Sequence, residues 1–122
     1  YNSNPLSLKS AIKNFDKINS KKSNKYLLIG DMLELGSHSK KLHKSIAPII
    51  NQTKIDKVFV KGKMAPIIFA NISKAKKGRI LLNKSQIIEL IRKDLNNNDY
   101  LMIKASLATG FNDIVKDLKG LH

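Results

Sequence analysis

Short apolar runs alternate with amphipathic helical segments along the whole of this 122-residue chain. Runs that are apolar without alternation are typical of strands buried on both faces of a sheet. Helical segments between consecutive strands imply right-handed crossovers, which make the sheet parallel and cover both of its faces. The sequence therefore predicts an α/β fold, a Rossmann-like, doubly wound and mostly parallel sheet with helices on both faces. The predicted strands are 26–29, 58–60, 80–82 and 100–103.

The helices are predicted from apolar side chains that recur every three to four residues. The first spans residues 5–18, with Asn4 as its N-cap and Pro5 at its first position. Pro48 is expected to kink or end the helix that follows Gly36. The others are a helix over 64–72, a helix capped by Ser85 with Ile88, Ile91 and Leu95 on one face, and a final helix with Phe111, Ile114, Val115 and Leu118.

In a doubly wound sheet, ligands bind beyond the carboxyl ends of the strands. The loops that matter are therefore 30–36, 61–63, 83–84 and 104–110. The chain opens on a helix cap, whereas such a domain usually opens on a strand. We therefore expect that the first strand is truncated, and that residues 1–122 form a single domain of a larger protein.

The net charge of +14 suggests a nucleic-acid partner. Lysine accounts for 21 of the 23 basic residues, and Arg79 and Arg92 are the only arginines. Lysine, isoleucine and asparagine, whose codons are rich in A and T, make up 49 of the 122 residues, so biased base composition explains the charge without a ligand. Base readout and stacking favour arginine and exposed aromatic side chains. We expect no specific nucleic-acid partner, but a basic Rossmann-like module that binds nucleotide or nucleic acid remains the alternative.

Several other classes of protein and site are disfavoured by the sequence. The chain has no cysteine, which excludes disulfides and thiolate metal sites and favours a reducing compartment. It has no apolar run near the ~18–20 residues of a membrane helix and no signal-peptide pattern. We expect a cytoplasmic monomer that does not bind membranes. Neither a Walker-type phosphate loop nor a dinucleotide-binding glycine motif occurs.

Polar residues follow two of the predicted strands closely. Asp31 and Glu34 could bind a metal, orient an ammonium group or act as a base, or simply be solvated in a turn where Gly36 takes a positive φ. Lys104 and Ser106, after the last strand, could hold a carboxylate or phosphate together with backbone N–H groups. Lys61 and Lys63 flank Gly62, which is weak support for a phosphate site in so lysine-rich a chain.

The two internal histidines do not have the spacing of a metal site. His38 and His43 are five residues apart, so they do not share a helical face as ligands at i and i+4 do, and we expect no metal site. His43 is expected to make a local hydrogen bond within a helix.

Three stretches together resemble one enzyme family. Residues 1–7 read Tyr-Asn-Ser-Asn-Pro-Leu-Ser, residues 30–36 read Gly-Asp-Met-Leu-Glu-Leu-Gly, and residues 104–107 read Lys-Ala-Ser-Leu. With His43 following the second stretch, the chain resembles the C-terminal domain of the Mur ligases, the ATP-dependent peptide ligases of peptidoglycan synthesis. The resemblance covers the whole chain and is greatest to the type that adds D-alanyl-D-alanine.

The resemblance implies a parent enzyme of three domains that uses ATP and Mg²⁺. Its substrates would be UDP-N-acetylmuramoyl-tripeptide and D-Ala-D-Ala, joined through an acyl phosphate on the tripeptide. This domain would help to hold the adenosine and to position the dipeptide. Carried over residue by residue, Asn2 and Asn4 would lie near the nucleotide, whereas Asp31, Glu34, Lys104 and Ser106 would approach the dipeptide or the acyl phosphate.

The chain departs from the family pattern at three positions. The aspartate expected immediately before Tyr1 is absent, and Ala105 and Leu107 stand where the family has glycine and arginine. The loss of the arginine puts in doubt any charge pairing that it provides. The ATPase and UDP-sugar domains are also absent from the chain. We therefore expect no catalytic residue in it, no tightly bound cofactor, and neither ATP hydrolysis nor ligation by the chain alone.

Overall fold

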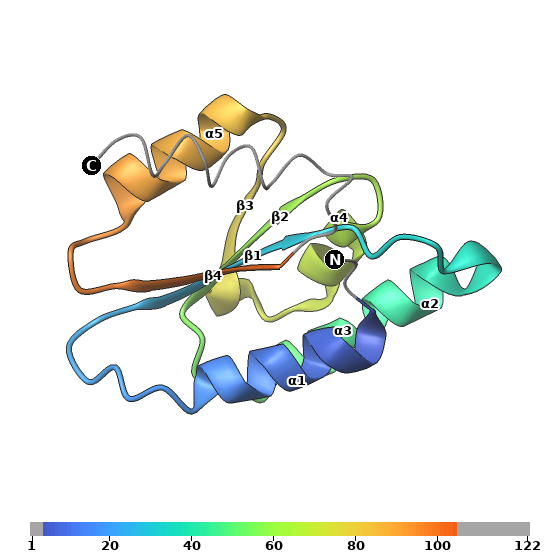
Figure 1. Cartoon of the computed structure of the whole chain (residues 1–122), viewed down its shortest axis with the longest axis horizontal. Coiled ribbons are helices and arrows are strands. Elements are labelled where there is room, and N and C mark those ends of the chain that lie inside the picture. The colour runs from blue at the N-terminus through green and yellow to red at the C-terminus, as the bar shows by residue number, and fades with distance from the viewer. Residues whose placement is uncertain (1–3, 105–122) are drawn as a thin grey trace.

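A parallel sheet of four strands lies at the centre of the molecule (Figure 1). The computed structural model describes residues 4–104. The predicted final helix and the loop before it lie outside the described residues. The strands are β1 (Lys25–Gly30), β2 (Lys57–Lys61), β3 (Lys77–Ile80) and β4 (Tyr100–Lys104), and their order in the sheet is β3-β2-β1-β4.

The strand order makes this a doubly wound sheet. The chain moves outward from β1 to β2 and then to β3, and it returns across the sheet to place β4 on the other side of β1. The direction of winding therefore reverses between β1 and β4, and this topological switch point is where open α/β sheets bind their ligands. The predicted Rossmann-like, doubly wound fold is confirmed.

Helices cover both faces of the sheet (Figure 1). Among the described helices, α1 (Pro5–Asp16), α2 (Ser39–Lys44), α3 (Ile46–Asn51) and α4 (Ala65–Asn71) lie on one side of the sheet. The opposite face carries α5 (Lys84–Glu89), which continues as a wider π-helical turn over Leu90–Asp94. Short 3₁₀ turns over Gly36–His38 and Lys74–Lys76 complete the described elements.

Two apolar clusters fill the space between the sheet and its helices. Alternation along the strands divides the side chains between them: Leu27 and Ile29 join the larger cluster under α1, α3 and α4, while Leu28 joins the smaller one under α5. Phe59 of β2 also belongs to the smaller cluster, and it lies beside Leu28 in the register of the sheet. The all-apolar sequences of the central strands are explained by this burial on both faces.

The third strand differs from the prediction, which placed it at 80–82. It spans Lys77–Ile80, and Leu82 beyond it is 75% exposed. Gly78 allows the strand to pass close to its neighbour, since a Cβ there would lie 2.6 Å from the Phe59 ring. The pairing with β2 shifts register between Val58 and Val60. The other three predicted strands are confirmed to within a residue or two.

The helices predicted in the first half of the chain are largely confirmed. Asn4 caps α1, its side-chain oxygen accepting the backbone N–H of Ser7 at 2.8 Å, and Pro5 follows at the first position. The helix ends at Asp16, so Ile18, which the prediction placed in the helix, is 39% exposed. The helix after Gly36 divides into α2 and α3 at Ser45, because Pro48 cannot donate a hydrogen bond to the preceding turn.

The prediction for α5 was wrong in its cap and in its buried face. Asn83 is the N-cap and accepts the N–H of Gln86 at 2.9 Å, while Ser85 lies inside the helix. The Gln86 side chain in turn accepts the N–H of Leu82, so the two side chains satisfy backbone donors reciprocally. Ile87 and Leu90 are fully buried. The predicted face of Ile88, Ile91 and Leu95 is only partly buried.

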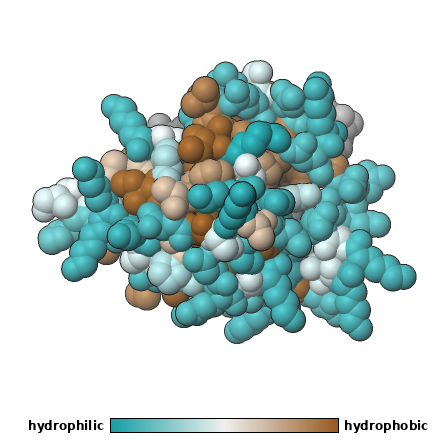
Figure 2. Space-filling view, turned by 180° about the vertical axis from the view of Figure 1, so that it is seen from behind, coloured by the Kyte–Doolittle hydropathy of each residue, from teal (hydrophilic) through white to brown (hydrophobic). Residues whose placement is uncertain are grey.

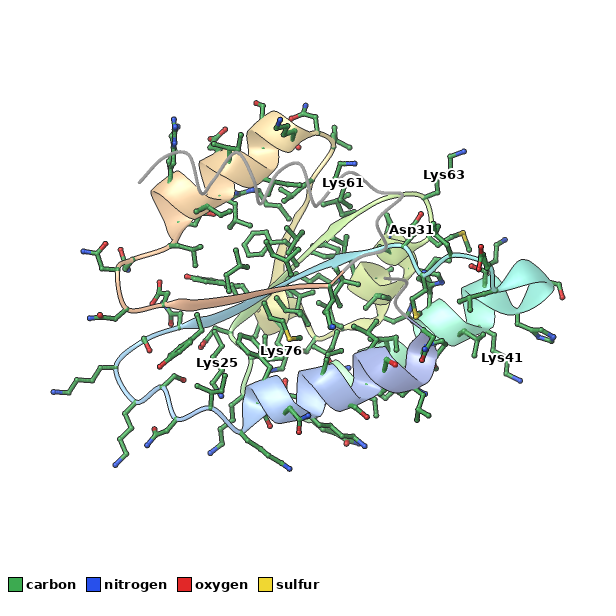
Figure 3. The ribbon with its side chains drawn as sticks, in the orientation of Figure 1. Lys25, Asp31, Lys41, Lys61, Lys63 and Lys76 are labelled. Atoms are coloured by element: carbon green, nitrogen blue, oxygen red, sulfur yellow. The ribbon has the colours of Figure 1, made fainter. Side chains whose placement is uncertain are left out.

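Several lysines are structural. Lys25 is only 3% exposed, and its ammonium group donates to the carbonyl of Asp16 at the end of α1 (2.6 Å). Lys76 donates to the carbonyls of Thr53 and Ile55 at 2.7 and 2.8 Å, after α3 (Figure 3). Cations suit helix C-terminal ends, where carbonyl groups are left without partners. Part of the basic composition therefore stabilises the fold.

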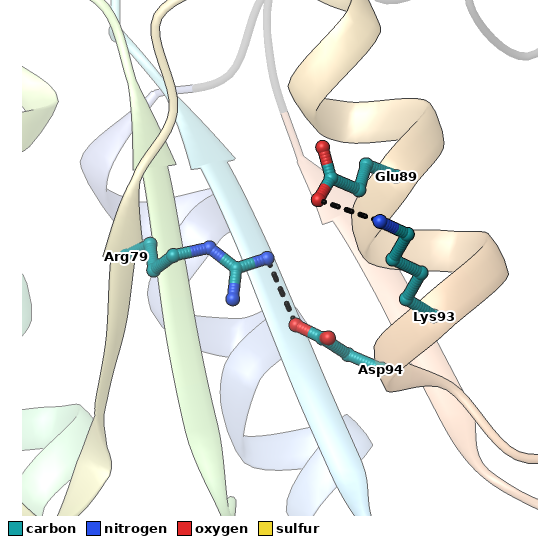
Figure 4. A network of polar contacts seen from close by, with 4 residues as sticks. All are labelled: Arg79, Glu89, Lys93 and Asp94. Atoms are coloured by element: carbon teal, nitrogen blue, oxygen red, sulfur yellow. Dashed lines mark hydrogen bonds and ion pairs between the residues drawn. The ribbon is translucent and has the colours of Figure 1, made fainter.

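An ion pair joins β3 to the end of the helix above it (Figure 4). Arg79 lies 2.8 Å from Asp94, and its guanidinium group is 5.5 Å from the centre of the Phe59 ring. A second, exposed pair links Lys93 to Glu89 along the helix at 3.4 Å. One of the two arginines of the chain is thus used to pack α5 against the sheet.

Candidate functional site at the carboxyl edge of the sheet

Most of the sequence-predicted site residues within the described part of the chain lie at one edge of the sheet. Asp31 and Glu34 follow β1, and Lys104 ends β4, where it pairs in register with Ile29 of β1. The helix α1 runs opposite to the strands, so its first residue and its cap Asn4 lie at the same edge (Figure 1). The edge includes the switch point between β1 and β4. The structure therefore brings the start of the 30–36 loop, the end of β4 and the cap of α1 together around the expected ligand position.

Asp31 accepts three backbone hydrogen bonds at this edge. One carboxylate oxygen accepts the backbone N–H groups of Met64 (2.9 Å) and Ala65 (2.7 Å), and the other accepts that of Lys63 (2.9 Å) (Figure 3). A carboxylate has about four acceptor positions, so three are filled. Asp31 thus connects the end of β1 to the start of α4. The bonds within residues 4–104 leave Asp31 one acceptor position for the predicted contact with a ligand.

Gly62 turns the chain tightly beneath this carboxylate. Its φ is +133°, and a Cβ atom there would overlap the Asp31 carboxylate. Lys61 and Lys63 flank the glycine, as the sequence analysis noted, and Lys63 is exposed while Lys61 is partly buried. The backbone N–H of Lys63 already donates to Asp31, so a contact of Lys63 with an anion at this edge would come from its exposed ammonium group (Figure 3).

Glu34 is held in an unusual backbone conformation. Its φ is +63°, in the left-handed region, which costs a residue with a Cβ atom about 1–2 kcal/mol. The side chain is exposed, and no hydrogen bond or ion pair joins its carboxylate to another residue within 4–104. Backbone strain of this kind is concentrated at functional sites. The predicted positive φ of Gly36, two residues later, is confirmed at +58°.

His43 supports the same loop from the other side. It is fully buried, and its Nε2 accepts the backbone N–H of Met32 at 2.9 Å. Its Nδ1 lies 2.7 Å from the carbonyl oxygen of Ser39, one helical turn earlier. The predicted local hydrogen bond is confirmed. The longer-range bond to Met32 was not predicted, because it depends on how α2 packs beside the end of β1.

The remaining sequence-predicted residues fall into two groups. Asn4 uses its side-chain oxygen to cap α1, and Lys104 is partly buried at the end of its strand. Asn2 and Ser106 lie outside the described residues. Within 4–104, no group of three histidine, aspartate or glutamate side chains comes together in a way that could hold a metal ion.

Two open hollows lie at the opposite edge of the sheet. Their volumes are about 630 and 500 Å³, and the loops 19–24 and 96–100 line both of them. The acidic side chains there are already bonded: Asp99 accepts the N–H groups of Asn24 and Asn96, and Asp56 accepts that of Lys25. These hollows lie at the amino ends of β1 and β4, away from the switch-point loops.

The surface is mostly hydrophilic on the face opposite to the one that Figure 1 shows. Figure 2 shows hydrophilic side chains spread over most of one face, with smaller apolar areas between them. The described helices, all within residues 4–104, include none that is both long enough and apolar enough to cross a membrane.

Known proteins similar to this chain share one family. The family model described as Mur ligase, glutamate ligase domain, matches residues 1–107. The UDP-N-acetylmuramoyl-tripeptide–D-alanyl-D-alanine ligase of Bacillus subtilis is 33% identical over 121 residues, which are 97% of this chain and 26% of the relative. The ligase of the same name from Buchnera aphidicola (subspecies Acyrthosiphon pisum) is 32% identical over 120 residues, or 97% and 25%. The chain thus spans about a quarter of the length of these relatives.

Solved structures share the fold. The MurF ligase of Thermotoga maritima in complex with ADP matches with a TM-score of 0.74 and 24% identity, over 95% of this chain and 26% of that one. A MurF structure from Acinetobacter baumannii matches with a TM-score of 0.76 and 22% identity, over 97% and 26%. The likeness to these solved structures supports the fold, and the match to the family model over residues 1–107 shows the family. The chain therefore belongs to the Mur ligase family and contains its glutamate ligase domain.

Proposed function

We propose that this chain is the C-terminal domain of a UDP-N-acetylmuramoyl-tripeptide–D-alanyl-D-alanine ligase, an ATP-dependent enzyme of peptidoglycan synthesis in the cytoplasm. The observation that carries the proposal is the 30–36 loop. It leaves β1 beside the switch point, is held by hydrogen bonds at Asp31 and Met32, and leaves the Glu34 carboxylate without a partner among the described residues. Relatives of that name, about a third identical over nearly the whole chain, support the proposal.

The chemistry of peptide ligation assigns roles to these residues. ATP phosphorylates the terminal carboxylate of the tripeptide, and the amine of D-Ala-D-Ala attacks the acyl phosphate and displaces inorganic phosphate. Glu34 would pair with the ammonium group of the incoming dipeptide, and Lys104 with its carboxylate or with the acyl phosphate. Ser106 would add a hydroxyl donor beside Lys104. Asp31 would act chiefly by fixing the loop, since three of its acceptor positions are filled.

Nucleotide binding would involve the start of the chain. Asn2 and Asn4 would lie near the adenosine, and the structure of the Thermotoga relative in complex with ADP supports nucleotide binding by the whole enzyme. The enzyme would also require Mg²⁺. Residues 4–104 contain no cluster that fits the ion, so we assign its ligands to the rest of the protein.

The test uses the full-length protein in which this chain is the C-terminal part. Phosphate release is measured with ATP and UDP-N-acetylmuramoyl-tripeptide, and D-Ala-D-Ala is compared with single amino acids as acceptor. We expect release that requires the dipeptide. Glu34→Gln and Lys104→Met should each raise the KM for the dipeptide roughly tenfold or more, the loss of one charged hydrogen bond. Lys93→Gln, on the exposed face of the helix above the sheet, is the control.

Two outcomes would contradict the proposal, and a third would contradict the expectation that the chain alone is inactive. Phosphate release with a single amino acid would be consistent with the family but would show that D-Ala-D-Ala is not the acceptor. No acceptor-dependent release from a folded, ATP-binding protein would overturn the ligase assignment, and binding of arbitrary DNA that falls steeply with salt would then support the basic-module alternative. ATP hydrolysis by the 122-residue chain alone would overturn the expectation that it is inactive by itself.

A further inference from the structure

We propose that His43 is a positioning residue: as a neutral imidazole protonated at Nδ1, it fixes the backbone of the 30–36 loop so that Glu34 is presented to the acceptor. The structural part of this inference stands on contacts within the chain. Its effect on ligation rests on the proposed function.

The two contacts of the ring select a single tautomer. The partner of Nε2 is the backbone N–H of Met32, at 2.9 Å, which can only donate, so Nε2 must carry a lone pair. The partner of Nδ1 is the carbonyl oxygen of Ser39, at 2.7 Å, which can only accept, so Nδ1 must carry the proton. The Ser39 hydroxyl lies farther away, at 3.3 Å from Nδ1. The doubly protonated ring would have no acceptor for Met32.

The position of Met32 gives this contact its influence on the loop. Met32 follows Asp31 directly, and its side chain is buried in the larger apolar cluster. Asp31 is bonded to the start of α4, and the next peptide N–H is bonded to α2 through His43. The chain is therefore fixed from two helices just before it enters the left-handed conformation at Glu34. The hydrogen bonds of Asp31 and Met32 therefore restrict the backbone conformations that the 30–36 loop can adopt.

Loss of the ring nitrogen would leave a buried donor without a partner. The Met32 N–H lies in a buried environment, where an unpaired donor is costly and the backbone moves to reach another acceptor. Any such movement begins two residues before Glu34 and changes where its carboxylate lies. A shift of about 1 Å in a substrate-positioning group is enough to reduce catalysis on the order of a hundredfold.

A graded series of substitutions separates the two ring contacts. His43→Gln places an oxygen near the position of Nε2 and keeps an acceptor for Met32. His43→Asn reaches only the position of Nδ1 and keeps the contact with Ser39, and His43→Leu keeps neither. Leu90→Ala and Ile87→Val, in the cluster on the opposite face of the sheet, are the controls for a general loss of stability.

Two measurements on the 122-residue chain test the structural part. The ¹⁵N chemical shifts of the His43 ring should identify Nδ1 as protonated and Nε2 as unprotonated. Hydrogen exchange at the Met32 amide should accelerate about tenfold or more in the Asn and Leu variants relative to the two controls, and less in the Gln variant. A protonated Nε2, or equal exchange in the Gln and Leu variants, would overturn the proposal.

The third measurement tests the effect on ligation in the full-length protein. We expect the KM for D-Ala-D-Ala to rise in the order wild type, Gln, then Asn and Leu together, while the KM for ATP stays within about twofold. A KM for the dipeptide that tracks unfolding free energy across all the variants, the controls included, would overturn the positioning role. If the wild-type protein does not use the dipeptide at all, the proposed function and the effect of His43 on ligation are both wrong. The ¹⁵N shifts of the ring and the exchange rate of the Met32 amide then still test the hydrogen bond between His43 and Met32.

Discussion

Gly62 lies directly against the Asp31 carboxylate. A Cβ atom on Gly62 would come within 2.5 Å of the Asp31 Cγ, while Asp31 accepts the N–H groups of the three residues that follow the glycine. The loops after β1 and β2 are therefore built around one carboxylate, and neither keeps its geometry if the other changes.

Gly62→Ala should strongly destabilise the chain. Its φ of +133° costs a residue with a Cβ atom about 1–3 kcal/mol, and the overlap with Asp31 adds to this cost. We expect the free energy of unfolding, measured with urea, to fall by more than about 2 kcal/mol. Gly36→Ala is the matched control, because its φ is +58° but nothing lies within 4 Å of the new methyl group. Equal losses at the two glycines would contradict the role of Asp31.

Asp31→Asn should weaken the same junction from the other side. The amide keeps one acceptor oxygen and turns an NH₂ group toward a backbone donor, so at least one N–H loses its partner. We expect the free energy of unfolding to fall by about 1–3 kcal/mol. Asp56→Asn serves as the comparison, because Asp56 accepts a single backbone N–H, from Lys25, which an amide oxygen can also accept. A smaller loss at position 31 than at position 56 would refute this account.

Glu34→Gly should stabilise the chain slightly while it removes the proposed function. Glycine relieves a left-handed conformation that costs about 1–2 kcal/mol and loses about 0.5–1 kcal/mol through its greater freedom in the unfolded state. The net gain in the free energy of unfolding is about 0.5 kcal/mol, with Glu34→Gln as the neutral comparison. A clear loss of stability in the glycine variant would mean that the Glu34 side chain makes contacts that hold the fold.

The cap of α5 can be tested by a pair of alanine substitutions. Asn83→Ala removes the acceptor for the Gln86 N–H and should lower the free energy of unfolding by about 1 kcal/mol. Ser85→Ala, two residues later and inside the helix, should change it little, because alanine is the better helix former. The reverse order in thermal or urea unfolding would restore Ser85 as the cap.

Stability at high pH should depend on Tyr26. Burial raises the pKa of the Tyr26 phenol above its usual 10.0, and the negative charge of Asp99 adds to the increase. The folded state therefore keeps this proton to a higher pH than the unfolded state does. The stability that the neutral phenol contributes is complete below about pH 10 and is lost as pH rises through the folded pKa.

The measurement is the free energy of unfolding between about pH 9 and 11. Tyr26→Phe should make its decrease with pH less steep, because phenylalanine has no proton to lose. Tyr100→Phe, at a side chain that is 40% exposed, is the control for the loss of a phenol. An equal change of slope in both variants would show that burial of Tyr26 is not the cause.

The sequence predicted the strands whose side chains need burial on both sides. The runs at 26–29 and 58–60 were recognisable because an apolar residue at every position is typical of a strand that is buried on both faces. The edge strand β3 was misplaced because charged residues cover its aromatic neighbours. Lys77 lies 5.6 Å from the Phe69 ring centre and Arg79 lies 5.5 Å from that of Phe59. The aliphatic parts of lysine and arginine side chains cover apolar surface as an apolar residue would, but these residues do not produce an apolar pattern in the sequence.

The site could be predicted as a set of loops but not as a set of contacts. Strand ends and the 30–36 motif placed Asp31 and Glu34 at the ligand edge. The backbone groups that Asp31 binds are 32 to 34 residues away in the sequence, so no local pattern reports them. The His43 contact with Met32 likewise depends on the packing of α2 beside β1.

The irregular pairing of β3 bears on how the protein behaves in concentrated solution. An edge strand that is long, flat and apolar invites strands of other molecules to add to it, which leads to aggregation. Here the edge strand has only four residues, carries Lys77 and Arg79, and is out of step with β2 between Val58 and Val60. Along this side the sheet offers no regular row of backbone groups for another chain to extend.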